Sequence, residues 1–331
     1  MVVINNTVSN IRINKITFLV FYSMSENNKA SIIICTFNRL KLLKLCIGSI
    51  TALQTSPSQF EVVIIDNNSN DGTEDFCKGL SQTYGSYKWK YIRETQQGIA
   101  FARTRGAKEA AGNIIAYIDD DCLAEPDWLN EIIIFYDNNS AAMSTGGRII
   151  PKYLAPPADW FGKYFWGLVG NYDLGNKVFQ MKGARYPSGA NMHFRKTAFE
   201  KYDYFDGNLG RSGKSLMAGE EKAMYLKLIG ANEKVYYLPQ VIVHHHVEGN
   251  KFDKEYVKHH SMGIGASERL MNKGSFAKLT MKFIEYLAKF GYAIGYGLIY
   301  LLQGNPSKMW MLIKFRWWVM EGFLNPEKTK R

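Results

Sequence analysis

Three consecutive carboxylates, Asp119, Asp120 and Asp121, form the motif of this chain with the clearest chemistry. They follow the apolar run 114–118, which is typical of a short strand buried on both faces. Carboxylates this close raise one another's pKa unless a cation neutralises them. Hard oxygen ligands favour Mg²⁺ or Mn²⁺, and Mg²⁺ is usually shared between one or two carboxylates and the phosphates of a substrate. The triplet therefore indicates a divalent metal site, with a solvated acidic turn as the alternative.

The elements before the triplet alternate between strands and helices. A short β-branched run predicts a strand at 31–35, and further strands are predicted at 60–65 and 88–93. Apolar residues at helical spacing predict a helix at 40–53, and further helices are predicted at 73–84 and 99–111. Such alternation favours βαβ units and a parallel sheet. Ligands of these sheets bind beyond the carboxyl ends of the strands. The polar clusters 36–39, 66–71 and 119–121 all follow strands, so we expect them to meet in one crevice.

The composition indicates a globular protein and excludes several kinds of binding site. Apolar residues make up 46% of the 331 residues and charged residues 21%, which is typical of a globular protein. Four scattered cysteines form no CxxC pair, so we expect reduced cytosolic thiols and neither a zinc site nor a disulfide framework. No G-x-G-x-x-G or P-loop occurs, which argues against a dinucleotide site or an ATP phosphate cradle.

Most of the net charge of +11 belongs to the C-terminal part. Residues 251–331 hold 14 Lys and Arg against 6 Asp and Glu. This asymmetry indicates an anionic partner, either a nucleic acid or an anionic membrane surface. The apolar stretch 283–302 is interrupted by Glu285 and Lys289 and is too short to span a bilayer. Basic residues beside Trp310 and Trp317 favour an interfacial helix on anionic lipid, with packing on the domain or at a dimer interface as the alternative.

The first residues fit poorly with the rest of the chain. An apolar run at 16–22 follows two basic residues, but it is short and no A-x-A cleavage site follows it. We expect residues 1–28 to be a disordered extension, or the product of an upstream start codon with Met24 as the working initiator.

Six motifs follow one another along the chain: CTFNR (35–39), IIDNNSNDGT (64–73), QGIAFAR (97–103), DDD (119–121), SGANM (188–192) and GEE (219–221). Each motif alone is common. Their order resembles the inverting family 2 nucleotide-sugar glycosyltransferases of GT-A fold, and the resemblance covers about 31–247.

The resemblance implies roles for the residues of the first half. The residues that would bind the nucleotide are Thr36, Asn38, Arg39, Asp66, Arg103, Asp119 and Asp120. Asp66 would accept a hydrogen bond from the base, with an Asx-turn cap as its structural alternative. Arg103 would face the base or the diphosphate, where a guanidinium suits phosphate oxygens, with a surface helix arginine as the alternative. Asp121 would hold Mn²⁺ or Mg²⁺ directly, Asp119 would contact the ribose or the metal through water, and the role of Asp120 stays open.

The second half would supply the base and further ligands. The resemblance implies Glu221 as the base that takes the proton of the acceptor hydroxyl, with Glu220 as the alternate; favourable interaction with a helix N-terminus is the alternative for both. Of the three histidines 244–246, we favour His244 and His246 as metal or phosphate ligands over His245, because an extended segment turns alternate side chains the same way.

Two further groups are candidates for the sugar and acceptor walls. Gly189, Ala190 and Asn191 would line the donor-sugar and acceptor wall, where small residues allow close backbone approach. The aromatic residues 160, 161, 165 and 166 could stack on a sugar, but aromatics at such mixed spacing are more often core.

The residues and the resemblance together predict an α/β chain. A GT-A domain at 29–250, with a Rossmann-like nucleotide-binding sheet and a mixed acceptor-side half, precedes a helical, basic and aromatic region at 251–331. We expect a metal-dependent inverting glycosyltransferase that moves a sugar from a nucleoside diphosphate sugar, UDP-sugar first, to a glycan, lipid-linked or polysaccharide-precursor hydroxyl. We expect it in the cytoplasm, peripheral on the membrane. A nucleotidyltransferase and a nucleic-acid binder are the alternatives; neither a phosphate loop nor a nucleic-acid-binding motif supports them, so we expect no nucleic-acid partner.

Overall fold

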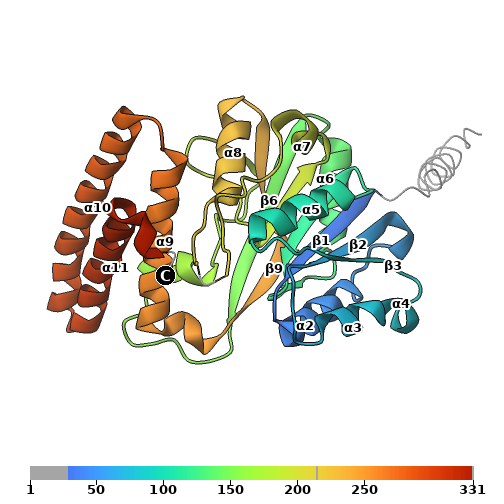
Figure 1. The fold of residues 1–331 in the computed structure, drawn as a ribbon, viewed down its shortest axis with the longest axis horizontal. Coiled ribbons are helices and arrows are strands. Elements are labelled where there is room, and N and C mark those ends of the chain that lie inside the picture. The colour runs from blue at the N-terminus through green and yellow to red at the C-terminus, as the bar shows by residue number, and fades with distance from the viewer. Residues whose placement is uncertain (1–28, 214, 330–331) are drawn as a thin grey trace, which may run out of the picture.

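The computed structural model describes residues 29–213 and 215–329, so the expected extension at 1–28 lies outside the described residues. One nine-stranded sheet runs through the molecule in the order β3-β2-β1-β4-β8-β6-β9-β5, with β7 paired to β9 (Figure 1). The strands are β1 (Ala30–Thr36), β2 (Phe60–Asp66), β3 (Lys88–Arg93), β4 (Ile114–Asp119), β5 (Cys122–Ala124), β6 (Ala142–Tyr153), β7 (Phe179–Met181), β8 (Asn191–Arg195) and β9 (Lys234–Val247).

The first four strands are parallel and form the Rossmann-like sheet expected from the sequence. All residues of β1 and β2 are buried, because helices cover both faces. Side chains of β1 alternate between two cores: Ile32 and Ile34 pack with helices α2 and α6, and Ile33 packs with α5, α7 and α8. The helices are α2 (Leu40–Ile50), α3 (Thr73–Lys78), α4 (Leu80–Thr83), α5 (Ile99–Glu109), α6 (Trp128–Asn138), α7 (Thr197–Tyr202) and α8 (Glu220–Gly230).

The predicted elements of this half are confirmed with small differences in their ends. The helix expected at 73–84 is divided at Gly79 into α3 and α4, and the helices expected to reach 53 and 111 end at Ile50 and Glu109. Glycine has a low helix propensity, which explains the division at Gly79.

The second half of the sheet is mixed. Strand β8 pairs antiparallel with β4 and β6, whereas β6 and β9 pair in parallel. The short β5 follows the acid triplet directly and pairs with β9 so that Cys122 lies opposite His245. This pairing brings the histidine segment beside the triplet, although about 120 residues of chain separate them.

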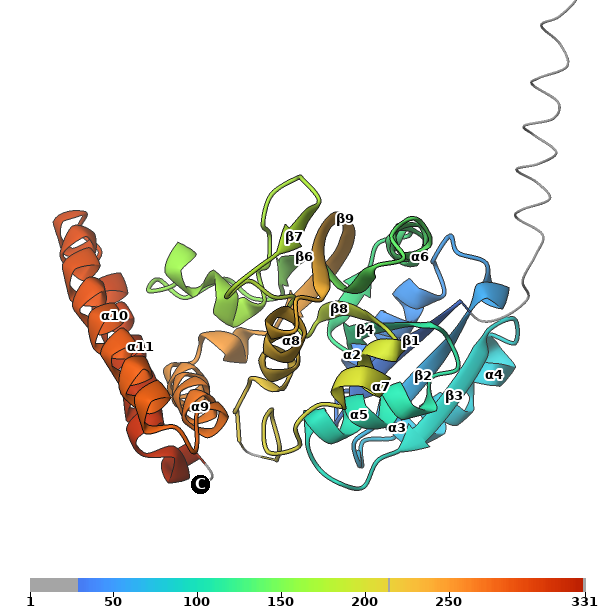
Figure 2. The same ribbon diagram turned by 90° about the horizontal axis from the view of Figure 1, so that it is seen from above.

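Three helices follow the sheet and form a separate layer at one end of the molecule, seen in both views (Figures 1 and 2). They are α9 (Lys254–Met271), α10 (Phe276–Leu302) and α11 (Pro306–Leu324). Helix α9 lies next to the sheet domain, α11 packs on α9, and α10 packs on α11 as the outermost element. A third hydrophobic core joins α10 and α11 to the 3₁₀ segment Lys163–Val169. None of the helices described is long and apolar enough to cross a membrane.

Candidate active site

A cleft of about 420 Å³ lies beyond the carboxyl ends of the parallel strands, where the sequence placed the crevice. Residues of each predicted polar cluster contribute to its wall, including Thr36, Arg39, Asn67 and the acid triplet. The start of α8 and the loop before it form another wall, and α9 reaches the cleft through His260. The cleft therefore gathers side chains from both halves of the sheet and from the C-terminal helices.

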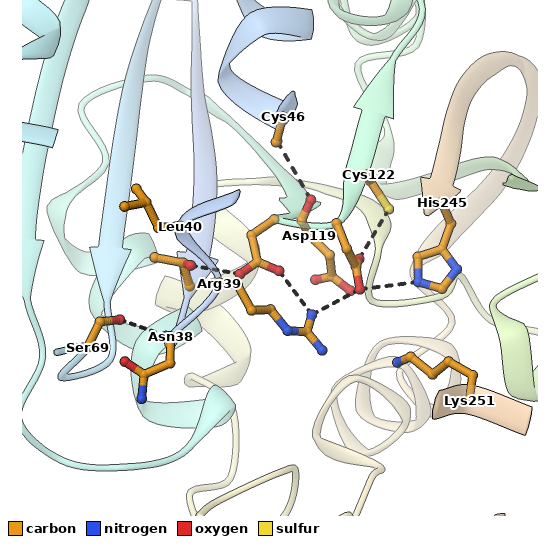
Figure 3. Close-up of polar contacts among 12 residues, drawn as sticks. Asn38, Arg39, Leu40, Cys46, Ser69, Asp119, Cys122, His245 and Lys251 are labelled. Atoms are coloured by element: carbon orange, nitrogen blue, oxygen red, sulfur yellow. Dashed lines mark hydrogen bonds and ion pairs between the residues drawn. The ribbon is translucent and has the colours of Figure 1, made fainter. Parts of the chain in front are cut away.

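The acid triplet is bound to cationic and hydroxyl groups of the chain itself. The Arg39 guanidinium lies between Asp120 and Asp121, with Nη1–O distances of 3.2 and 2.9 Å (Figure 3). Thr36 also donates its hydroxyl to Asp120. Burial raises the pKa of the Asp120 carboxyl to about 7, although Arg39 opposes the rise. Asp120 is thus tied into the wall, while the side chain of Asp119 is 36% exposed.

The structure places His245, and not the expected His244 or His246, beside the acid triplet. Nε2 of His245 lies 3.3 Å from Oδ2 of Asp121, and His245 is the histidine of this segment that lines the cleft (Figure 3). His244 contacts Glu125 instead, and His246 lies on the same side of the strand as His244, with its Nε2 buried and unpartnered among the described residues. Alternation along β9 was anticipated, but the sequence did not show which side faces the triplet.

The pair Asp121 and His245 fits a divalent cation. Nδ1 of His245 lies 2.7 Å from the carbonyl oxygen of Val169, which only accepts, so Nδ1 is the donor and Nε2 is directed at Asp121. Metal-bound histidines commonly fix their other ring nitrogen in this way. Burial works against the imidazolium, but the hydrogen bond and charge of Asp121 raise the pKa of His245. In the described parts of the chain no three His, Cys, Asp or Glu side chains form a complete metal site, so phosphate oxygens would have to supply further ligands.

The acidic pair divides into one buried and one accessible carboxylate. Glu220 accepts from Arg103 Nη1 at 2.5 Å, and Nη2 of the same arginine lies 3.1 Å from Asp119. Burial and the neighbouring Glu221 raise the pKa of the Glu220 carboxyl. Glu221 is half-buried, lines the cleft, and also lines a second hollow beside it. Arg103 therefore joins the triplet to the acidic pair, and Glu221 is the member of the pair open to a substrate.

Two of the residues expected to bind the nucleotide, Asp66 and Asn38, instead hold loops that lie next to the cleft. Asp66 is fully buried; its carboxylate accepts from the Ser69 backbone N–H and the Tyr91 hydroxyl, in agreement with the structural alternative of a turn cap. Asn38, at φ 51°, links two loops through Ser69 and the backbone of Asn70. Neither residue lines the cleft.

Asn67, which was not among the residues expected to bind the nucleotide, lies on the cleft wall. Its amide group contacts the backbone of Glu94, Gln96 and Gly98 and so fixes the loop that opens α5. An asparagine directly after a strand end was the signal available in the sequence.

The segment 188–192 also divides between wall and interior. Ser188, Gly189 and Ala190 line the cleft. A Cβ on Gly189 would lie 2.6 Å from Arg103 Nη2, so the missing side chain lets the guanidinium pack against the backbone, and a contact of Gly189 with the sugar stays a prediction. Asn191 does not reach the cleft: it is fully buried, and its side chain bonds to the backbone of β6 and β9 and to Trp128. Strand β8 begins at Asn191, so its first side chain is directed into the sheet interior.

The aromatic residues around 160–166 are mostly core, as their spacing indicated. Trp160 and Phe165 are buried in the third hydrophobic core, and Phe161 packs against it. Trp166 is 40% exposed and lies under the Lys163 ammonium. None of the four lines the cleft, so a stacking platform for the sugar is not formed by them there.

Comparison with known proteins identifies the class. The model of the family described as Glycosyl transferase family 2 matches residues 31–203, which is more than half of the chain. The chain belongs to this family. The family and enzyme class predicted from the motifs are thus confirmed, and the chain is a glycosyltransferase. A curated relative, the glucosyl-dolichyl phosphate glucuronosyltransferase of Haloferax volcanii, is 27% identical over 249 residues, 74% of this chain and 77% of the relative.

Solved structures confirm the GT-A fold. The mannosyltransferase PcManGT from Pyrobaculum calidifontis, in complex with GDP-Man and Mn²⁺, superposes with a TM-score of 0.60 at 14% identity and covers 95% of this chain and 97% of its own. Residues 1–349 of S. aureus TarS, in complex with UDP-GlcNAc, give a TM-score of 0.54 at 16% identity and cover 92% of this chain and 91% of theirs.

Proposed function

We propose that this glycosyltransferase is metal-dependent and inverting, and that it moves a sugar from a nucleoside diphosphate sugar, with a UDP-sugar as the first candidate, to a hydroxyl of a glycan, lipid-linked or polysaccharide-precursor acceptor. One observation carries the proposal: the accessible carboxylate of Glu221 and the pair Asp121 and His245 line the same cleft. The GDP-Man, UDP-GlcNAc and Mn²⁺ of the structural neighbours support the donor class and the metal.

The leaving-group side of the cleft is the acid triplet. Asp121 and His245 would hold Mn²⁺ or Mg²⁺, which as a Lewis acid would stabilise the negative charge of the departing diphosphate. Arg39 already neutralises Asp120 and Asp121, so it can turn its guanidinium toward phosphate oxygens when a cation takes its place. Thr36 keeps Asp120 in the wall during this exchange.

Glu221 would act as the base. As the acceptor oxygen forms its bond to the anomeric carbon, the hydroxyl proton passes to the Glu221 carboxylate. The anomeric bond to the diphosphate oxygen breaks and its electron pair leaves with the nucleoside diphosphate. Attack from the face opposite the leaving group inverts the anomeric centre. Proton transfer by a positioned carboxylate contributes roughly 10²–10⁴ in rate.

A second hollow, of about 350 Å³, is our candidate for the acceptor site. Glu221 and Ser188 line both this hollow and the main cleft, as a base between donor and acceptor must. Tyr172, Leu174 and Tyr186 give its wall an apolar and aromatic character, and Arg185 adds a positive charge. Aromatic faces and a guanidinium suit a sugar that carries a phosphate. A lipid-linked acceptor, as the name of the haloarchaeal relative indicates for that protein, fits this chemistry.

The outer face of α10 supports our proposal that the chain attaches to an anionic membrane surface, and we propose the cytoplasmic side for this attachment. Only three residues of this helix are buried. Its exposed large apolar side chains are Phe276, Met281, Ile284, Leu287, Tyr292, Ile294, Leu298, Ile299, Leu301 and Leu302. Residues 286–320 hold four basic residues and no acidic one. An apolar face beside positive charge suits the surface of a bilayer with anionic lipids.

A donor screen tests the function. Purified protein is incubated with UDP- and GDP-sugars and Mn²⁺, and release of the nucleoside diphosphate is measured with Asp121→Asn as the control. We expect one donor class to be turned over, EDTA to abolish turnover, and Asp121→Asn to lower it at least a hundredfold. Turnover that is equal in EDTA and in the variant would exclude the metal-dependent mechanism.

A further inference from the structure

Lys251 is a nearly buried ammonium group without an acidic partner. It lies in the 3₁₀ segment Gly249–Phe252 that follows β9 and is 6% exposed. Its Nζ donates to the Tyr256 hydroxyl at 3.1 Å and lies 5.2 Å from the centre of that ring. Within 29–213 and 215–329, no carboxylate lies within ion-pair distance of it. A buried charge is costly unless it is paired, so this position indicates an anion that arrives with a ligand.

Two further nitrogen-bearing side chains lie in the same corner. Arg211, from the loop before α8, and His260, from α9, both line the cleft, whereas Lys251 is not part of its described wall. Nδ1 of His260 is buried and has no hydrogen-bond partner among the described residues. Burial and the charges of Arg211 and Lys251 lower the pKa of His260 to about 3, so its imidazole is neutral and can donate a hydrogen bond.

This corner adjoins the acid triplet. In Figure 3 the Lys251 side chain is drawn below His245, with its ammonium end directed toward the Arg39 guanidinium. The charge of Lys251 acts on Asp121, so a phosphate group that reached Asp121 through a shared cation would also lie within the electrostatic range of Lys251.

We infer that Lys251, together with Arg211 and His260, forms a second anion site that binds the diphosphate of the donor on the side away from the acid triplet. This inference rests on the proposed nucleoside diphosphate sugar donor. Charge-assisted hydrogen bonds from fixed donors would stabilise the negative charge that develops on the diphosphate as the sugar leaves. The segment after 250 then contributes to the reaction and is not only an attachment region.

Calorimetric titration of the full chain tests the site, with UDP, GDP, UMP and uridine as probes, in Mn²⁺ and in EDTA. In Lys251→Met we expect affinity for the better-bound diphosphate to fall about 10- to 100-fold in both buffers, as for a lost hydrogen bond to a charged group. Uridine affinity should change less than twofold, and Lys251→Arg should restore most of the loss. Lys254→Met, at the exposed lysine that begins α9, is the matched control and should bind as the wild type does.

The outcomes separate the inference from the proposed function. If the wild type binds UDP or GDP and Lys251→Met binds it within twofold, at an unchanged melting temperature, the second anion site is excluded. A soluble alkyl phosphate is a further probe. If Lys251→Met keeps its affinity for the nucleoside diphosphate but loses affinity for the alkyl phosphate, Lys251 binds an acceptor phosphate and not the donor diphosphate, and the inference is excluded. If the wild type binds no nucleoside diphosphate, the proposed function itself fails.

Discussion

Arg103 and Glu220 form an ion pair of 2.5 Å in which both side chains are about 95% buried. Arg103 comes from α5 of the parallel half, and Glu220 is the first residue of α8. Because the same guanidinium also contacts Asp119, it fixes the distance between the acid triplet and the helix that carries Glu221. Arg103 thereby positions the base and the leaving-group side with respect to each other.

Glu221→Gln should lower the transfer rate by roughly 10²–10⁴, because the amide cannot take the acceptor proton. The affinity for the donor nucleotide should change little, since Glu221 is not among the residues that hold the triplet. Initial rates at saturating donor, together with nucleotide titration, measure the two effects.

Glu220→Gln is the comparison for this prediction. It keeps the shape of the buried side chain but weakens the ion pair with Arg103, so it should lower both stability and activity. A Glu220→Gln enzyme with a larger rate loss than Glu221→Gln at equal stability would assign the base to Glu220.

Gly189→Ala should disturb the site through Arg103. The added Cβ would lie 2.6 and 2.8 Å from the two terminal guanidinium nitrogens, so the guanidinium would have to leave Asp119 or Glu220. We expect activity to fall at least tenfold and the free energy of unfolding to fall by about 1–3 kcal/mol, as for other overpacked sites. Gly48→Ala is the control, because a Cβ at this position in α2 meets nothing within 4 Å. Equal activities of the two variants would contradict this role of Gly189.

Stability should fall between pH 7 and pH 5, in part through His193. Burial lowers the pKa of this histidine to about 3, well below the value of about 6.5 in an unfolded chain. The unfolded state therefore binds more protons in this window, and the free energy of unfolding contributed by His193 falls by about 2 kcal/mol from pH 7 to pH 5. Urea unfolding at the two pH values, in wild type and His193→Gln, measures the difference. A pH dependence as steep in the variant as in the wild type would contradict the assignment.

Binding of the protein to lipid vesicles should depend on the exposed apolar side chains of α10. We expect the full chain to sediment with vesicles that contain anionic lipid and to be released by high salt. The double variant Leu298→Glu and Leu302→Glu should bind at least tenfold more weakly, because both exposed leucines leave the apolar face.

Leu45→Glu is the matched control, since Leu45 is an exposed leucine of α2, away from the C-terminal helices. Unchanged vesicle binding by the double variant would contradict the proposal. A dimer of the wild type that the double variant dissociates would instead assign this face to contact between two copies of the chain.

The order of strands and helices along the chain was predictable because the local pattern of apolar residues encodes it. Alternation of strands and helices placed the three polar clusters at one sheet edge, where they lie. Which side chains face the cleft depends on pairing between distant strands. The register of β5 against β9 places His245 beside the triplet. Asn191 is the first residue of β8, and its side chain therefore points into the sheet interior. The role of Lys251 was hidden for the same reason, because a lysine in a basic segment looks like surface charge until packing buries it.

Helices α9 and α11 cross with their backbones in close contact. A Cβ at Gly265 would lie 2.0 Å from the Val319 carbonyl oxygen, and one at Gly322 would lie 2.0 Å from that of Met262. The same α9 carries His260 on the cleft wall. Because the two backbones are in contact, α11 cannot shift without moving α9. A displacement of the outer helices on a lipid surface would therefore also displace His260 and change the shape of the cleft.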